Sequence, residues 1–222
     1  ADNWWQAERA LTAMKPRFAG EKPLDSAPIA TWLREAVKDA GTTISSTGDV
    51  ESAFADGDAV FEACYDIAPA VHATLETASA TARFAEGRLE LWIASQAPEA
   101  ARRAAAEAVG IGAQSVQLYP VAAGGSFDAR LEKQHAIEVA QIAKALGRPV
   151  QLTWSRAEEM KALPPRTPAA IALTAKLDSA TRLPVAWRAR IACPSTVREF
   201  GARLFDNLTP EAAREAAAGE PD

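Results

Sequence analysis

The sequence predicts an α+β fold in which N-terminal helices are followed by a βαβαβ unit with additional antiparallel hairpins. The apolar residues recur at a helical period near 3.6 before Gly57 and at a strand period near 2 after it. Strands and helices then alternate in short steps, which favours a partly parallel, right-handed unit. Two long apolar runs near the C-terminal end, separated by a short polar turn, predict a further hairpin.

The first 55 residues predict helices. Residues 2–14 and 26–40 carry apolar side chains at helical spacing. Asp2 can cap the first helix, Trp32 lies on the apolar stripe of the second, and Gly41 can end the second helix. Residues 49–54 predict a short third helix. We therefore expect an N-terminal helical segment over residues 1–55.

The strands follow from residue 59 onward, and we expect an α+β domain over residues 56–200 with a C-terminal tail over 201–222. Alternating side chains predict a first strand and then a hairpin that turns at Glu86-Gly87. In chain order we expect strands at 59–67, 80–85 and 88–95, a helix from Pro98 to Gly110, a strand at 115–121, a helix at 131–146, and strands at 149–155, 170–178 and 183–192.

Alanine dominates the apolar composition. It supplies 52 of the 222 residues, about half of the 48% that is hydrophobic, so the core should be poor in large side chains. Such a chain either packs small residues closely or is part of a larger assembly. Alanine-rich faces, such as that over 100–108, would then be surfaces cut from that assembly or packed closely within it, and an exposed apolar patch above a few hundred Å2 is expected. The six dispersed Trp are expected to anchor the core or an interface.

Composition also excludes several classes of protein. A pI near 5.2, a net charge of −5 and no Lys/Arg cluster argue against a nucleic-acid partner, and no apolar run is long enough for a membrane span. Two Cys and two His are too few for a disulfide framework or a four-ligand zinc site, and we expect no metal ligands. The start, without Met or a signal peptide, suggests a processed or excised chain.

A glycine loop is the first candidate for binding. Gly124, Gly125, Ser126 and Phe127 lie between a predicted strand and a predicted helix, where backbone N–H groups can bind an anion. The loop has neither the Gly-Lys-Ser/Thr of a P-loop nor a dinucleotide fingerprint. On pattern alone, a plain tight connection is favoured.

Two further features carry polar chemistry. Gln96 follows a predicted strand, and its amide can donate and accept at an edge where α/β units bind ligands, although a helix-capping or loop role is the simpler interpretation. His72 and Glu76, four residues apart, could form an acid–base pair of a small enzyme, although a structural pair is more common. His135, on a predicted amphipathic helix, is expected at the surface or the rim.

The order of these segments resembles one family. Residues 70–76 resemble a His-Ala-x-x-Glu-Pro segment, residues 92–98 a Trp-x-x-x-Gln-x-Pro segment, and residues 121–130 a Gly-Gly-Gly-Phe-Gly-Arg-Arg loop. Residues 2–7 and 142–158 resemble the family upstream and downstream of these motifs. The family is the molybdenum hydroxylase large subunits of the xanthine dehydrogenase/aldehyde oxidase superfamily, and the branch is most similar to isoquinoline 1-oxidoreductase β-subunits.

The resemblance implies the end of a hammerhead-like domain followed by a molybdopterin-binding region. It implies that Gln96, Gly124, Gly125, Ser126 and Phe127 lie against a molybdenum–molybdopterin cofactor. It further implies hydroxylation of N-heteroaromatic rings or oxidation of aldehydes, together with the rest of a large subunit and an iron–sulfur subunit. A homodimer, and a cytoplasmic or periplasmic location, are left open.

The sequence departs from the family pattern in the glycine loop and beyond it. Ser126 and Asp128 replace glycines, Ala129 replaces an arginine, and Thr77 replaces the proline after Glu76. No Gly-x-Gly-Glu segment with the catalytic glutamate follows Ile191. We therefore expect a domain or fragment without turnover by itself and assign no catalytic residue; the alternative is a degenerate member that serves as an interaction module without molybdenum.

Overall fold

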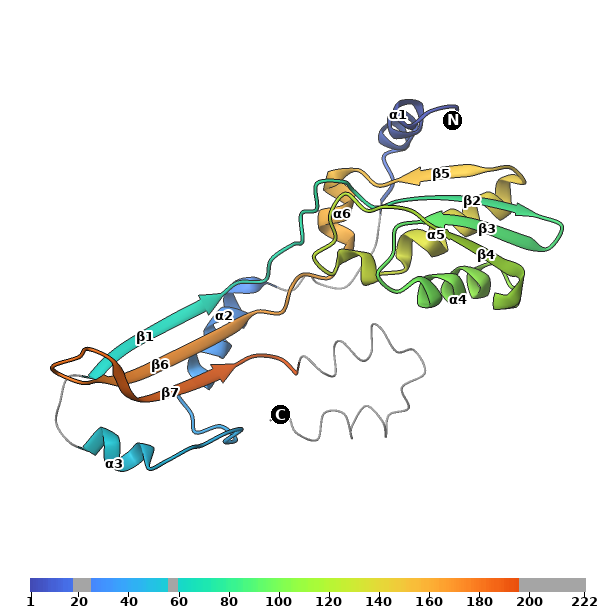
Figure 1. The fold of residues 1–222 in the computed structure, drawn as a ribbon. Coiled ribbons are helices and arrows are strands. Elements are labelled where there is room, and N and C mark those ends of the chain that lie inside the picture. Colours follow the sequence, from blue (N-terminus) through green and yellow to red (C-terminus); the bar gives the residue numbers. More distant parts are fainter. Residues whose placement is uncertain (18–24, 56–59, 196–222) are drawn as a thin grey trace. The chain divides into compact units, whose positions relative to one another are not determined.

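The computed structural model describes residues 1–17, 25–55 and 60–195. These residues form two compact units that interleave along the chain, each built on its own β-sheet (Figure 1). Unit 1 comprises residues 1–25, 75–125 and 133–160, and unit 2 comprises residues 26–74, 126–132 and the chain from 161 onward.

Unit 1 contains a four-stranded mixed sheet in the order β4-β3-β2-β5. The strands are β2 (Ser79–Ala85), β3 (Arg88–Ile93), β4 (Val116–Pro120) and β5 (Val150–Thr153). The first two form the predicted hairpin, and both of its turn residues, Glu86 and Gly87, have positive φ as a tight two-residue hairpin turn requires.

Two helices connect these strands and pack against the sheet. The helix α4 (Pro98–Ala108) joins β3 to the parallel strand β4, as predicted for a βαβ step. The helix α5 (Gln134–Leu146) leads to β5, which pairs antiparallel with β2. β5 therefore runs in the same sense as β3 and β4, but the hairpin strand β2 lies between them.

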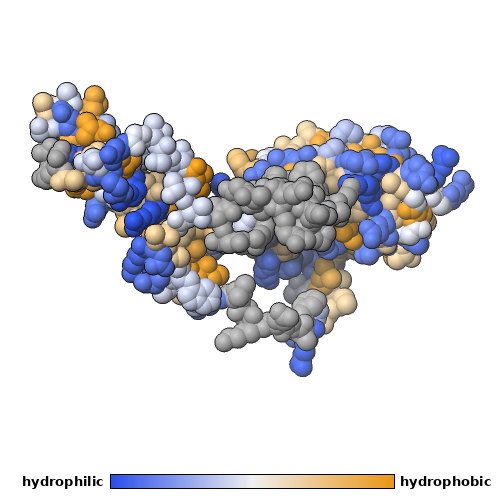
Figure 2. Space-filling view, turned by 90° about the horizontal axis from the view of Figure 1, so that it is seen from below, coloured by the Kyte–Doolittle hydropathy of each residue, from blue (hydrophilic) through white to orange (hydrophobic). Residues whose placement is uncertain are grey.

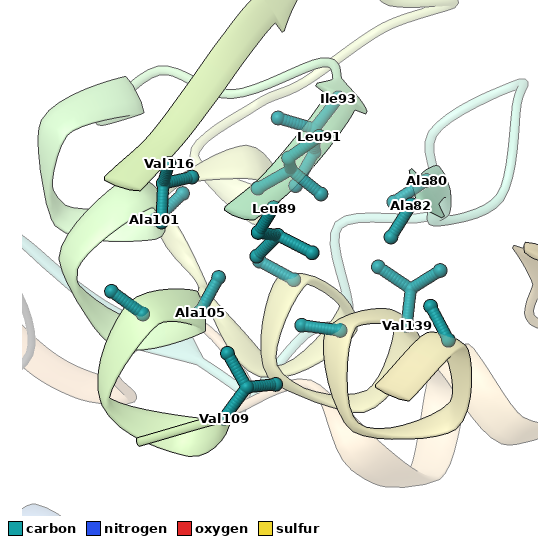
Figure 3. Packing of buried hydrophobic residues seen from close by; sticks show 14 residues of the cluster. Ala80, Ala82, Leu89, Leu91, Ile93, Ala101, Ala105, Val109, Val116 and Val139 are labelled. Carbon is teal, nitrogen blue, oxygen red and sulfur yellow. The ribbon is translucent and has the colours of Figure 1, made fainter. Parts of the chain in front are cut away.

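The core of unit 1 is built from small side chains. Leu89, Leu91 and Ile93 project from β3 towards the two helices, and alanines fill most of the remaining positions (Figure 3). Eight of the 14 buried cluster residues are alanine: Ala80, Ala82, Ala101, Ala105, Ala106, Ala136, Ala140 and Ala143. The alanine-rich face of α4 is buried within unit 1. Its small methyl groups let the neighbouring backbones approach closely.

Three local features of unit 1 differ from the expectations. The cap of α1 (Trp4–Met14) is Asn3 instead of Asp2, because its Oδ1 accepts the Gln6 N–H at 3.0 Å. His135 is 1% exposed and not at the surface, because α5 turns it towards Trp154, whose ring lies edge-on to it. A short helix, α6 (Arg156–Ala162), follows β5.

Unit 2 contains a three-stranded antiparallel sheet in the order β1-β6-β7. The strands β6 (Ala169–Leu177) and β7 (Pro184–Ala192) form the predicted C-terminal hairpin. The strand β1 (Val60–Ile67) pairs along its full length with β6, although the two are far apart in the chain. The sequence pattern predicts these strands but not this pairing.

Two helices belong to unit 2. The helix α2 (Ser26–Ala36) has half-buried Ile29 and Leu33 on its apolar side, whereas Trp32, expected on the same stripe, is exposed. The helix α3 (Val50–Ala55) begins after Asp49, whose carboxylate accepts the Ser52 N–H at 3.0 Å. The cap therefore lies where the predicted third helix begins.

The α+β prediction is confirmed. None of the helices among the described residues is long and apolar enough to cross a bilayer. The predicted tail over 201–222 lies outside the described residues.

Candidate functional site

The candidate site lies where two parallel strands of unit 1 end. Gln96 follows β3 and the glycine loop follows β4, and the two strands are direct neighbours. The Val121 N–H donates to the Ile93 carbonyl at 3.1 Å, so the pairing continues to this edge. The carboxyl edge of parallel strands is where α/β sheets usually bind ligands. The fold thus brings Gln96, Gly124 and Gly125 to one edge.

Gln96 occupies the short connection between β3 and α4. Its side chain is exposed, and the cap position of α4 belongs to Ala97, which has no polar side chain. The Ser95 hydroxyl accepts the Ala97 N–H at 3.0 Å. The helix-capping role that the sequence left open for Gln96 is therefore not its role in this turn.

Gly124 is joined to Glu76 by two hydrogen bonds. The Gly124 N–H donates to Glu76 Oε2 at 2.8 Å, and the Glu76 N–H donates to the Gly124 carbonyl at 3.0 Å. A Cβ at position 124 would lie 2.5 Å from the Glu76 Cβ, closer than real carbon atoms approach. Position 124 is therefore a glycine because Glu76 packs directly against it.

A partly buried ion pair holds the segment that carries Glu76. Glu159 of α6 is 3% exposed, and its Oε1 accepts the Ala78 N–H at 2.9 Å while its Oε2 accepts Arg156 Nη1 at 2.5 Å. Arg156 Nη2 also donates to the Leu75 carbonyl at 3.0 Å. Backbone groups on both sides of Glu76 are thus fixed by one carboxylate and one guanidinium.

The glycine loop passes from unit 1 to unit 2 after Gly125 and adopts an uncommon backbone over residues 125–128. Gly125 has φ +102°, which glycine tolerates, but Phe127 and Asp128 also have positive φ, at +50° and +72°. The Ser126 carbonyl accepts the Ala129 N–H at 2.9 Å, and Phe127 is 67% exposed. Three positive φ values in four residues mark a strained loop, and such strain often accompanies ligand sites.

A buried arginine follows the loop within unit 2. Arg130 is 2% exposed, and its Nη2 donates to the hydroxyl of Thr74, which is also buried, at 3.4 Å. Thr74 follows Ala73, another non-glycine residue with positive φ. Two of the segments that resemble the family, one containing Thr74 and one containing Arg130, are therefore in contact in unit 2.

The structure leaves the proposed roles of these residues as predictions. Gln96, Gly124 and Gly125 share an edge of unit 1, whereas Ser126 and Phe127 belong to unit 2. The acid–base hypothesis for His72 and Glu76 also stays a prediction. No cluster of three or more metal-ligating side chains occurs among residues 1–17, 25–55 and 60–195.

Sequence reasoning missed the pair Arg156 and Glu159. The signal was present, since an Arg-x-x-Glu spacing directly after a strand places both side chains on one side of a short helix. What could not be read from the sequence is that Glu159 is buried against the 75–78 segment.

Comparison with known proteins identifies the fold and the family. The molybdopterin cofactor-binding domain family matches residues 35–192, most of the chain. The chain belongs to this family. The resemblance to molybdenum hydroxylases, drawn from the order of the motifs, is thereby confirmed.

Two relatives and one solved structure illustrate what this chain is similar to. The isoquinoline 1-oxidoreductase subunit beta of Brevundimonas diminuta is 31% identical over 96 residues, 43% of this chain and 12% of that protein. A probable hypoxanthine oxidase of Escherichia coli is 29% identical over 140 residues, 63% of this chain and 14% of that protein. The CO dehydrogenase structure from Oligotropha carboxidovorans has the same fold, with 19% identity, a TM-score of 0.52 and coverage of 64% of this chain and 18% of that chain.

The chain spans about an eighth of the length of the curated relatives it matches. What those relatives do as whole proteins is therefore carried to this chain only as a proposal.

Proposed function

We propose that this molybdopterin-binding domain contributes the cofactor-contacting part of an oxidoreductase large subunit that hydroxylates N-heteroaromatic rings or oxidises aldehydes. The observation that carries the proposal is the shared carboxyl edge of β3 and β4, with Gln96 at the end of one and the glycine loop at the end of the other. The name of the isoquinoline relative supports the substrate class.

The residues at this edge offer a polar side chain and accessible backbone to a molybdenum–molybdopterin group. The exposed Gln96 amide can donate to and accept from an oxygen-rich group, and Gly125 presents backbone without a Cβ. The Gly124 N–H is already bonded to Glu76, so it serves the loop and not the cofactor. Gln96, Gly125 and the backbone of Ser126 and Phe127 would hold the group.

The chain's own residues then have three tasks. Gln96 orients the bound group by hydrogen bonding, Glu76 holds the start of the glycine loop, and Glu159 with Arg156 fixes Glu76 in turn. When bound, the molybdenum centre supplies the two-electron oxidation of the substrate carbon. No side chain of this chain is assigned to that step.

The proposal includes partners and a division of the chain. Residues 56–200 form the cofactor-binding part, residues 1–55 end a hammerhead-like domain, and residues 201–222 form a tail. The rest of a large subunit supplies the catalytic base, and an iron–sulfur subunit accepts the electrons. We expect no turnover from the purified 222-residue chain, and reduction of a dye by that chain with an aldehyde or an N-heterocycle would contradict this.

Molybdenum and pterin content test the proposal directly. The protein is expressed in its natural gene context, and metal analysis and pterin fluorescence are compared for the natural sequence, Gln96→Ala and Gln117→Ala. We expect stoichiometric molybdenum in the natural sequence, at least a several-fold loss in Gln96→Ala, and no loss in Gln117→Ala, which alters an exposed glutamine on β4 away from the edge. Equal loss in both variants would contradict a role for Gln96.

A second candidate function has its own observation. The Gly124 N–H donates to the Glu76 carboxylate and is not available to a cofactor. Asp128 adds a second carboxylate to the same loop, and negative charge there is unfavourable beside an anionic cofactor. These features favour a degenerate member that serves as an interaction module without molybdenum. Absence of molybdenum and pterin in the natural gene context is the result this candidate requires, and stoichiometric molybdenum excludes it.

A further inference from the structure

A cavity opens on the face of the unit 2 sheet that carries charged side chains. Its volume is about 340 Å3, within the roughly 300–1,000 Å3 that small-molecule sites usually occupy. Ala172 and Thr174 of the central strand β6 line its middle, with Glu62 of β1 to one side and Arg188 and Arg190 of β7 to the other. The cavity therefore has an acidic side and a basic side, separated by small residues.

The strand register sets the distance between the two sides. Thr174 of β6 pairs with Glu62 of β1 and with Arg188 of β7, and the next position on the same face pairs Ala172 with Arg190. Neighbouring strands lie about 4.8 Å apart, so about 10 Å of sheet separates the backbone of β1 from that of β7. Because the two side chains of β6 are short, a ligand can lie across this space between the acidic and the basic side.

Glu62 and Arg190 have no counterion within the described residues. Glu62 makes no hydrogen bond or ion pair there, and Arg190 donates only to the Lys38 carbonyl, over a long 3.4 Å. Both residues are exposed, and the space-filling view likewise shows hydrophilic side chains at the surface among apolar ones (Figure 2). Two opposite charges that face one cavity without pairing to each other leave both available to a ligand.

The other charged groups near the cavity are already held. Glu51 of α3 pairs with the Arg188 guanidinium, and an aromatic ring of α3 has its centroid 5.3 Å from the same group. Lys176, the next residue of β6 on this face, is buried and does not line the cavity. Arg188 therefore serves as a fixed wall, and Glu62 and Arg190 are the groups that can bind.

We propose that this cavity binds a small zwitterion whose ammonium and carboxylate are separated by several bonds, such as an ω-amino acid. The ligand's carboxylate accepts hydrogen bonds from Arg190, its ammonium donates to Glu62, and its methylene chain lies over the small residues of β6. A simple anion or cation leaves one protein charge unmatched. A protein surface fits less well, because the cores of protein interfaces are depleted of charged residues.

Titration calorimetry of the purified chain with three probes of equal chain length tests this proposal. δ-Aminovalerate carries both charges, valerate carries only the carboxylate, and pentylamine carries only the ammonium. We expect the dissociation constant of δ-aminovalerate to be at least about tenfold below that of either other probe, because each charge adds a charge-assisted hydrogen bond. Equally tight binding of valerate or pentylamine would show a site for a single charge and contradict the proposal. No binding of δ-aminovalerate would overturn it.

Variants assign the binding to the two unmatched charges. Glu62→Gln and Arg190→Gln should each weaken the binding of δ-aminovalerate at least about tenfold. The matched control is Arg182→Gln, because Arg182 is exposed in the connection between β6 and β7 and does not line the cavity. The exchange of both charges, Glu62→Arg with Arg190→Glu, should restore binding with the ligand reversed, which loss of the fold could not do. Equal weakening in the control, or no recovery in an exchanged variant whose circular dichroism is unchanged, would contradict the proposal.

Discussion

The two sheets of this protein differ in how their apolar faces are covered. In unit 1, α4 and α5 cover one face of the sheet with alanine-rich surfaces, and the outward face is largely polar. In unit 2, α2 and α3 lie against the face that carries the charged side chains of the strands, and among the described residues nothing buries the opposite, apolar face. The small residues of unit 1 therefore serve internal packing, whereas the large apolar residues of the unit 2 strands stay exposed.

This difference also separates the two expectations that the alanine content raised. The alanine-rich segment at 100–108 is packed within its own unit, with Ala101 and Ala105 almost completely buried. The exposed patch that would indicate a larger assembly is present, but it is formed by aromatic and branched residues of the other sheet. Alanine content is therefore a poor guide to where a missing partner binds.

The largest expected effect comes from the core of unit 1. Leu91→Ala should lower the free energy of unfolding by about 3 kcal/mol, because it leaves a cavity among side chains too small to fill it. Ile191→Ala, at an exposed position of β7 in unit 2, should cost no more than about 0.5 kcal/mol. Urea unfolding of both variants measures the difference. Similar costs would show that Ile191 is packed in the isolated chain.

A smaller effect is expected at the glycine loop. Gly124→Ala should cost about 1–3 kcal/mol, because the new Cβ would displace Glu76 and break its hydrogen bond to the loop. Gly41→Ala in unit 2 is the matched control, since a Cβ there has nothing within 4 Å, and its effect should stay within about 0.5 kcal/mol. Equal stability of the two variants in thermal unfolding would contradict the close packing of Glu76 on the loop.

The smallest effect concerns two exposed carboxylates. The Ser52 backbone N–H lowers the pKa of Asp49 below its ordinary value in unit 2, and the Arg102 guanidinium lowers the pKa of Glu99 in unit 1. A lowered pKa in the folded state means that each stabilisation is present above the ordinary pKa and is lost as the pH falls through the lower value.

Carboxyl titration by NMR measures both groups. High salt should return the pKa of Glu99 towards its ordinary value more than that of Asp49, because a charge pair is screened more than a backbone hydrogen bond. Ser52→Ala should raise the pKa of Asp49 only in part, since the backbone donor remains. An equal response of both pKa values to salt would contradict the different causes assigned to the two shifts, a charge pair at Glu99 and a backbone hydrogen bond at Asp49.

Much of the local structure could be predicted because its causes are local. The turn at Glu86-Gly87, the α4 crossover and the C-terminal hairpin depend on neighbouring residues, and each occurs as predicted. His135 and Trp32 were misplaced because the helical stripe alone does not say which part of it faces the core. Their burial depends on packing partners distant in the chain.

The residues of the candidate site could be predicted from the sequence, but the hydrogen bonds that hold them in place could not. The order of motifs singled out Gln96 and the glycine loop, and the parallel pair β3 and β4 explains why Gln96 and Gly124 share an edge. The bond between Glu76 and Gly124, and its support by Glu159, connect segments far apart in the chain. Spacing along the chain carries no signal for such contacts.

The sequence by itself determined the α+β class, the positions of nearly all helices and strands, and the family, because these follow from local periodicity, turn chemistry and motif order. Only the tertiary structure decided that β1 pairs with β6, that β5 lies beyond β2, and that one apolar face of the second sheet is exposed among the described residues. These depend on which strands meet across long loops, and the free energy of that choice comes from side-chain packing between distant segments.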